Sequence, residues 1–224
     1  MHIPPAQRWI GALMILDLVF IVLHVLWGVS GVWFLNLDRE HNLPTAYQGV
    51  KLFAVASLAF GYWLLLRSGR MRGRSAWLLF SLLFAYLAVD DLSELHENVT
   101  YMLNPRLAFM HSRLLIFQPS MIKWMVLYAP FIAIGIALFS VLLWSLRRAE
   151  RAVQFFFFLG CAFFASVPAL EWMGAVARKT IFYTVPATIE EIFELLGQTF
   201  FIIALALLVR RQFHAHYAPR SAST

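Results

Sequence analysis

The sequence predicts an all-α integral membrane protein, a bundle of six transmembrane helices that forms a single domain over residues 1–224. Two observations support this fold class. The chain is 61% hydrophobic and only 13% charged, whereas a soluble domain is about half apolar and about a quarter charged. The chain also contains six mainly apolar runs. Each run is long enough to cross a membrane as a helix, which takes about 20 residues.

The six predicted spans are separated by polar connectors. At a rise of about 1.5 Å per residue, each span can cross a hydrocarbon layer about 30 Å thick. The spans are 9–35, 47–66, 75–97, 121–146, 152–177 and 188–209. We expect no soluble domain large enough to function by itself.

Arginine is distributed unequally between the two sets of connectors. If the chain crosses six times, the arginine-rich connectors, the segment before the first span and the segment after the last all share one side. The positive-inside rule places that side, and both termini, in the cytoplasm. The arginines concerned are Arg8, Arg67, Arg70, Arg72, Arg74, Arg147, Arg148, Arg151, Arg210, Arg211 and Arg220. Such connectors are typical of a bacterial protein, so we expect multi-pass insertion in the inner (plasma) membrane.

Composition and motifs exclude several other classes of function. The net charge of +6 does not indicate a nucleic-acid partner, because the basic residues mark helix ends. A single cysteine, Cys161, excludes a disulfide within the chain. The sequence has no glycine-rich phosphate loop, no Gly-x-Ser-x-Gly and no Cys-x-x-Cys. The partners we expect are the lipid bilayer, a cation or proton, and either further copies of the chain or a membrane complex.

Carboxylates are concentrated toward the outer ends of the predicted helices. Asp90, Glu94 and Glu97 are spaced at i, i+4 and i+7, so they share one face of the third span, and His96 adjoins them. Asp90 lies about 22 Å along that span and therefore still inside the hydrocarbon layer. An ionisable group there is costly unless it is paired or hydrated, which makes it a candidate for function. Because a helix C-terminus disfavours negative charge, a cation or a basic side chain must stabilise these acids.

The fifth and sixth spans add carboxylates to the same side. Glu171 lies in the fifth span, and Glu191 and Glu194 lie in the sixth. Thr188 and Glu191 form a capping-box pattern at the predicted start of the sixth span, which gives Glu191 a structural alternative. Glu194 is one turn deeper, and capping does not explain it.

The first span contributes Asp17 and His24, which are seven residues apart and share one face. His24 is level with Asp90 and is therefore a candidate ligand. Asp17 is nearer the cytoplasmic side. There it either begins a proton path or pairs with a neighbouring helix.

Carboxylates joined by imidazole suit a divalent metal ion, which is the only cofactor that the sequence suggests. The candidate metal ligands are Asp90, Glu94, Glu171, Glu194, His24, Glu191, Glu97 and His96. The Glu-x-x-His repeats typical of di-iron bundles are missing, and carboxylates in a low dielectric can bind and release protons. We therefore expect the protein to bind or translocate a cation or proton.

Three alternatives remain open at this point. One is a membrane metalloenzyme with oxidoreductase or hydrolase chemistry, so enzymatic activity is neither assigned nor excluded. A second is a helper subunit of a membrane complex. A third is a structural ion-pair network in which Lys51 and Lys123 neutralise the outer acids.

Overall fold

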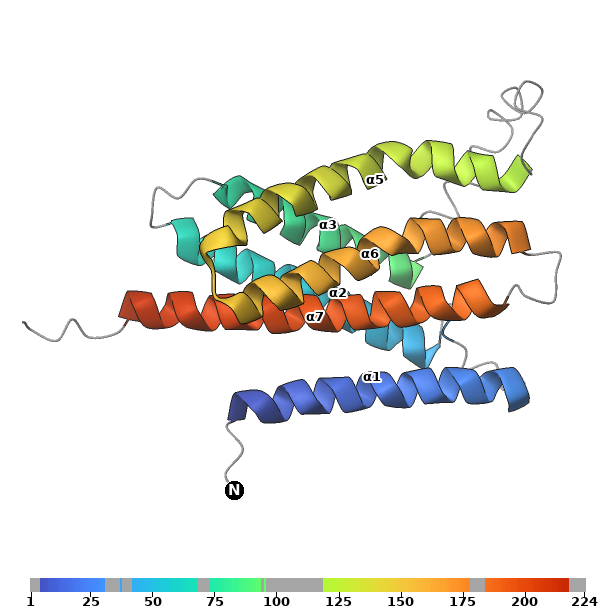
Figure 1. Ribbon diagram of the computed structural model, residues 1–224, viewed down its shortest axis with the longest axis horizontal. Helices are drawn as coiled ribbons and strands as arrows, with labels where there is room; N and C mark the ends of the chain where they lie inside the picture. Colours follow the sequence, from blue (N-terminus) through green and yellow to red (C-terminus); the bar gives the residue numbers. More distant parts are fainter. Residues whose placement is uncertain are drawn as a thin grey trace, which may run out of the picture.

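The computed structural model describes residues 5–30, 37, 42–67, 73–93, 95, 119–177 and 184–217. Within these ranges the chain forms six long helices and contains no strand, so the prediction of an all-α fold is confirmed. The helices are α1 (Pro5–Ser30), α2 (Leu43–Arg67), α3 (Arg74–Ser93), α5 (Pro119–Ser145), α6 (Arg151–Ala177) and α7 (Thr184–Tyr217), with a short 3-10 turn, η3 (Leu146–Arg148), after α5. They lie side by side along the long axis of the molecule (Figure 1).

Five helices are long and apolar enough to cross a membrane, judged on the described residues alone. The qualifying segments are Arg8–Leu26, Leu43–Leu66, Arg74–Ser93, Arg151–Gly174 and Val185–His214. The sixth helix, α5, has 27 residues, which makes it about 40 Å long. These helices indicate a multi-pass membrane protein, while insertion in a membrane and six crossings stay predictions.

Helix α7 extends beyond the predicted span 188–209 at both ends. It begins at Thr184, and Pro186 lies in its first turn, where a helix needs no backbone N–H donor. It ends at Tyr217, so Arg210 and Arg211 lie inside the helix, about two turns before its C-terminus. Both extensions lie outside the apolar run, so the apolar content of the segment does not predict them.

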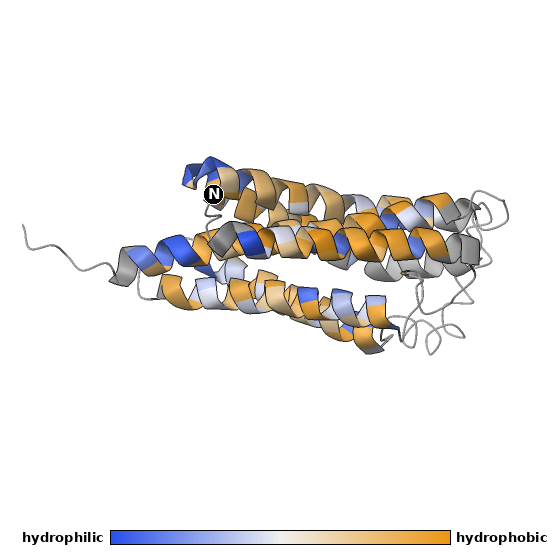
Figure 2. Cartoon of the chain, turned by 90° about the horizontal axis from the view of Figure 1, so that it is seen from below, coloured by the Kyte–Doolittle hydropathy of each residue, from blue (hydrophilic) through white to orange (hydrophobic). Residues whose placement is uncertain are grey.

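The helix ends that carry arginine gather at one end of the bundle, which we call the arginine end. There α1 begins, α2 is followed by α3, α5 is followed by α6, and α7 ends (Figure 1). Figure 2 shows hydrophilic residues concentrated at this end. The arginines within the described ranges are Arg8, Arg67, Arg74, Arg147, Arg148, Arg151, Arg210 and Arg211. The predicted topology requires this arrangement; that the arginine end faces the cytoplasm stays a prediction.

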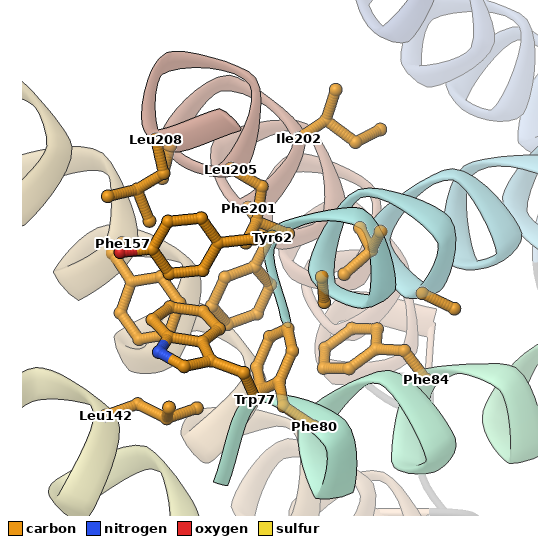
Figure 3. Close-up of a cluster of buried hydrophobic side chains, with 14 of the residues drawn as sticks. Tyr62, Trp77, Phe80, Phe84, Leu142, Phe157, Phe201, Ile202, Leu205 and Leu208 are labelled. Atoms are coloured by element: carbon orange, nitrogen blue, oxygen red, sulfur yellow. The ribbon is translucent and has the colours of Figure 1, made fainter. Parts of the chain in front are cut away.

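An aromatic core fills the centre of the bundle (Figure 3). The Phe201 ring of α7 lies 5.2 to 5.3 Å, centroid to centroid, from the rings of Phe80, Phe84 and Phe157. All four side chains are fully buried. In lipid, close packing of this kind replaces the hydrophobic effect as the main force between helices.

Two glycines allow α6 and α7 to approach one another closely. A Cβ atom added at Gly160 would lie 2.7 Å from the ring of Phe201, and one added at Gly197 would lie 2.7 Å from the ring of Phe164. Small residues at such contacts are typical of packed transmembrane helices. Because Phe201 is surrounded by other rings, it cannot turn away from an added methyl group.

We predict that Gly160→Ala destabilises the bundle. The methyl group forces Phe201 to shift, so the free energy of unfolding should fall by about 1 to 3 kcal/mol. The matched control is Gly61→Ala in α2, where an added Cβ meets nothing within 4 Å and helix propensity gains about 1 kcal/mol. Thermal unfolding in mild detergent compares the two. Equal midpoints would show that the α6–α7 contact does not depend on glycine.

Candidate functional site

Helix α1 contacts the rest of the bundle through one narrow stripe. Of its described side chains at positions 8–26, only Asp17, Phe20 and His24 are buried. Their spacing of three and four residues places them on one face, whereas Ile15 is 65% exposed and Leu18 is 59% exposed. Helix α1 accordingly lies at one edge of the bundle (Figure 1). Two of the three buried side chains are polar, so polar contacts position this helix.

Asp17 is the centre of these contacts. The Lys51 ammonium of α2 lies 2.7 Å from Oδ1, and the Tyr47 hydroxyl donates to the same oxygen at 2.7 Å. The Thr199 hydroxyl of α7 donates to Oδ2 at 2.5 Å. Asp17 is 0% exposed and Lys51 is 2% exposed. The carboxylate is therefore charge-balanced and hydrogen-bonded on both oxygens, as a buried carboxylate must be.

Lys51 links the same carboxylate to the backbone of α7. Its ammonium also donates to the carbonyl oxygen of Leu195 at 2.6 Å and lies 5.1 Å from the centre of the Tyr47 ring. The expectation that Lys51 neutralises the outer acids is wrong, because Asp17 is its carboxylate partner. The alternative for Asp17, pairing with a neighbouring helix, is confirmed. The side chain of Lys123 lies outside the described residues.

The charge pair lies well inside the apolar helix segments. Asp17 is nine residues from each end of the apolar segment Arg8–Leu26, and Thr199 is fourteen residues from the start and fifteen from the end of Val185–His214. Lys51 is eight residues inside Leu43–Leu66, or about 12 Å. At this depth an unpaired charge is costly, so the two residues depend on one another.

Two further polar contacts continue from this pair toward the opposite, acidic end of the bundle, where α3 ends and α7 begins. The backbone N–H of Leu37 donates to Nδ1 of His24 at 3.0 Å, so in the neutral ring Nε2 carries the proton and donates to the Thr188 hydroxyl at 3.0 Å. The Gln48 amide donates to Glu191 at 3.1 Å. Helices α1, α2 and α7 thus meet along a row of polar contacts, in which Gln48–Glu191 and His24–Thr188 are separate from the contacts of Asp17.

These groups define the polar seam, which consists of Asp17, His24, Tyr47, Gln48, Lys51, Thr188, Glu191 and Thr199. On α7 the seam follows Thr188, Glu191, the Leu195 carbonyl and Thr199, which share one face. These positions extend over about 16 Å of helix. Over the next two turns of α2 and α7 the buried side chains are apolar. The seam therefore runs from the acidic end to mid-depth and stops at the aromatic core.

Helix α7 gives Thr188 and the predicted site residue Glu191 a local role that differs from the capping box. Since α7 begins at Thr184, Thr188 lies one turn inside the helix and not at its cap. Thr188 binds His24 and Glu191 accepts from Gln48, so the capping-box interpretation of Thr188 and Glu191 is wrong. His24 also joins the seam and is held by α7.

The other predicted ligands are only partly described. Asp90 is buried near the end of α3, Glu171 is half-buried near the end of α6, and Glu194 is half-buried near the start of α7. All three lie at the acidic end. Glu94, His96 and Glu97 fall outside the described residues. Within the described ranges, no group of three or more His, Cys, Asp or Glu side chains is arranged to hold a metal ion. The predicted metal-ligand set therefore stays a prediction.

Sequence reasoning missed the uncharged members of the seam. These members are Tyr47, Gln48 and Thr199. Their hydroxyl and amide groups carry no charge and are tolerated in a helix, so the sequence alone does not mark them as candidates. A usable signal was present in α2, because Tyr47 and Lys51 are four residues apart on one face. A polar side chain one turn from an intramembrane lysine is a candidate partner for the same counter-charge.

Comparison with known proteins gives one match. Residues 7–209 match the model of a protein family described as a domain of unknown function (DUF8692). The chain belongs to this family. The matched residues include the whole polar seam and the aromatic core. No curated protein and no solved structure matches the chain.

We predict that Asp17 and Lys51 are strongly coupled in stability. Asp17→Asn or Lys51→Met alone leaves one charge unpaired at mid-depth and should lower the free energy of unfolding by about 3 kcal/mol. The double variant leaves neither charge and should lose clearly less than the sum of the two. Unfolding of all four proteins in detergent completes the cycle. Additive losses would contradict the pairing.

Proposed function

We propose that the protein binds and translocates protons, with the polar seam as the route from the acidic end and the Asp17–Lys51 pair as the central proton carrier. The observation that carries this proposal is a fully buried charge pair within the apolar segments, with further polar contacts on the same helices between it and the acidic end of the bundle. Ionisable residues at this depth are costly, and in membrane proteins they mark ion or proton pathways.

The charge of the pair explains how one proton is exchanged for another. In the resting state, carboxylate and ammonium sum to zero. A proton that binds Asp17 neutralises the carboxylate and leaves Lys51 as an uncompensated charge in a low dielectric, which is unfavourable. Release of one proton from Lys51, followed by return of the Asp17 proton to the amine, restores the pair. The pair passes on one proton for each that it takes up.

A proton fits this site better than a metal ion because Lys51 already occupies the position beside Asp17. A metal ion would have to displace the ammonium at 2.7 Å and separate the carboxylate from Tyr47 and Thr199. The carboxylates Asp90, Glu171 and Glu194 at the acidic end instead favour protons and other cations near the outer end of the seam. The seam ends at mid-depth, so translocation requires a second state that opens toward the arginine end. Helix α1, which is held by one stripe, is the element best suited to move.

We predict that proton flux depends on the charge pair. In vesicles with a pH-sensitive dye inside, Asp17→Asn and Lys51→Met should each slow flux by about a hundredfold or more, since each removes a proton-transferring group. The control is Ser81→Ala, whose hydroxyl donates to the carbonyl of Ala56 outside the seam. Its flux should equal that of the wild type. Folded variants of the pair that retain full flux would contradict the proposal.

The metal-binding alternative has a separate test at the acidic end. We expect protein purified in mild detergent without chelator to contain no stoichiometric transition metal, because the function that we propose needs none. Elemental analysis of the wild type beside Glu94→Gln and Glu194→Gln checks this. Stoichiometric iron, manganese or zinc that is lost in both variants would favour a membrane metalloenzyme over a proton carrier.

A further inference from the structure

One buried polar side chain next to the seam has no described role. Gln198 follows Leu195 by three residues on α7 and directly precedes Thr199. It is 0% exposed, and neither its Nε2 nor its Oε1 atom has a hydrogen-bond partner within the described part of the chain. The neighbouring buried polar residue, Thr199, does have a partner, because its hydroxyl donates to Asp17.

An unpaired amide is unfavourable at this depth. Lipid and apolar side chains offer no hydrogen bonds, so an amide buried there without partners loses those it makes in water. In native proteins such groups usually point to a bound water or ligand. Because the Gln198 amide has one unused acceptor and an unused N–H pair, its partner must be able both to donate and to accept.

The position of Gln198 brings it close to Lys51. On a helix surface, the carbonyl of residue i is flanked by the side chains at i+3 and i+4. The Lys51 ammonium donates to the carbonyl of Leu195, so helix geometry places it next to positions 198 and 199 of α7. Thr199 donates to the same carboxylate as Lys51, which agrees with this geometry. Gln198 lies on the other flank, where the aromatic core begins at Phe201.

Lys51 also has hydrogen-bonding capacity to spare. An ammonium has three N–H donors. Two of them are used, one by Asp17 and one by the Leu195 carbonyl, and the described residues provide no hydrogen-bond acceptor for the third. The ammonium, which binds the Leu195 carbonyl of α7, and the amide three residues further along α7 thus both have unused hydrogen-bonding groups.

We propose that Gln198 and Lys51 together hold one or two water molecules at mid-depth. The water accepts from the third N–H of Lys51 and exchanges hydrogen bonds with the Gln198 amide. The water gives the charge pair a second connection: the polar seam leads to Asp17, and the water contacts Lys51. This role rests on the proposed proton function, in which the Lys51 N–H bond breaks, the proton joins the water oxygen, and the electron pair stays on the amine. The water passes its proton onward, and the proton on Asp17 then moves to the Lys51 amine.

The first test locates the water directly. A high-resolution structure of the full-length protein in lipid nanodiscs should show a water peak about 3 Å from an amide atom of Gln198 and from Nζ of Lys51. Only apolar contacts around the amide would overturn the proposal. Density for a larger polar molecule of several heavy atoms would overturn it too, in favour of a ligand site.

The second test uses Gln198→Leu, which removes both amide atoms at nearly constant size. If water is bound there, the variant should fold, should gain no thermal stability, and should lose at least about tenfold in proton flux. The matched control is Gln154→Leu, whose amide bonds to the carbonyls of Arg147 and Ala149 at the arginine end; its flux should not change. A Gln198→Leu protein that is more stable and equally active would overturn the proposal.

The two proposals can fail separately. If the wild type shows no proton flux, the proposed function is wrong, and the water peak alone decides whether Gln198 and Lys51 hold water. If flux depends on Asp17 and Lys51 but the amide is dry, the proposed function holds and the water site is wrong.

Discussion

The contact between Asp17 and Lys51 determines where α1 lies. In lipid, an apolar side chain gains little by facing another helix in place of an acyl chain, so burial alone does not fix the position of a peripheral helix. Helix α1 is mostly apolar and mostly exposed, yet its buried stripe is centred on a carboxylate that binds α2 through Lys51 and Tyr47 and α7 through Thr199. One ion pair thus performs the role that close packing performs elsewhere in the bundle.

The rest of the bundle is held in the opposite way. Between α3, α6 and α7 the contacts are rings packed on rings, and Gly160 and Gly197 let the backbones approach. Such packing is dense and resists small displacements. A polar contact has alternative partners and can exchange them, for instance with a proton or water. The molecule therefore combines a rigid aromatic core with one helix whose attachment responds to charge.

The helices and the acidic end could be predicted from the sequence because apolar length and charge spacing are local properties. The partner of Lys51 could not, since it depends on which helices are neighbours, and a carboxylate at the acidic end was as plausible as Asp17. The start of α7 was misjudged for a local reason, because Thr188 and Glu191 have the spacing of a cap although the helix already begins at Thr184. The Thr199 hydroxyl carries no charge and lies in an apolar helix, so the sequence did not single it out as a partner of Asp17.

The position of Asp17 has a consequence for how the chain is made. Helix α1 is synthesised before α2, so the carboxylate at its centre leaves the ribosome before its counter-charge exists. A central aspartate is unfavourable for insertion into the bilayer, by about 3 kcal/mol. Entry of α1 and α2 into lipid as a paired hairpin lowers the cost of the unpaired carboxylate, because Lys51 then accompanies Asp17. Thr199 belongs to α7, so the site closes only after α7 has been synthesised.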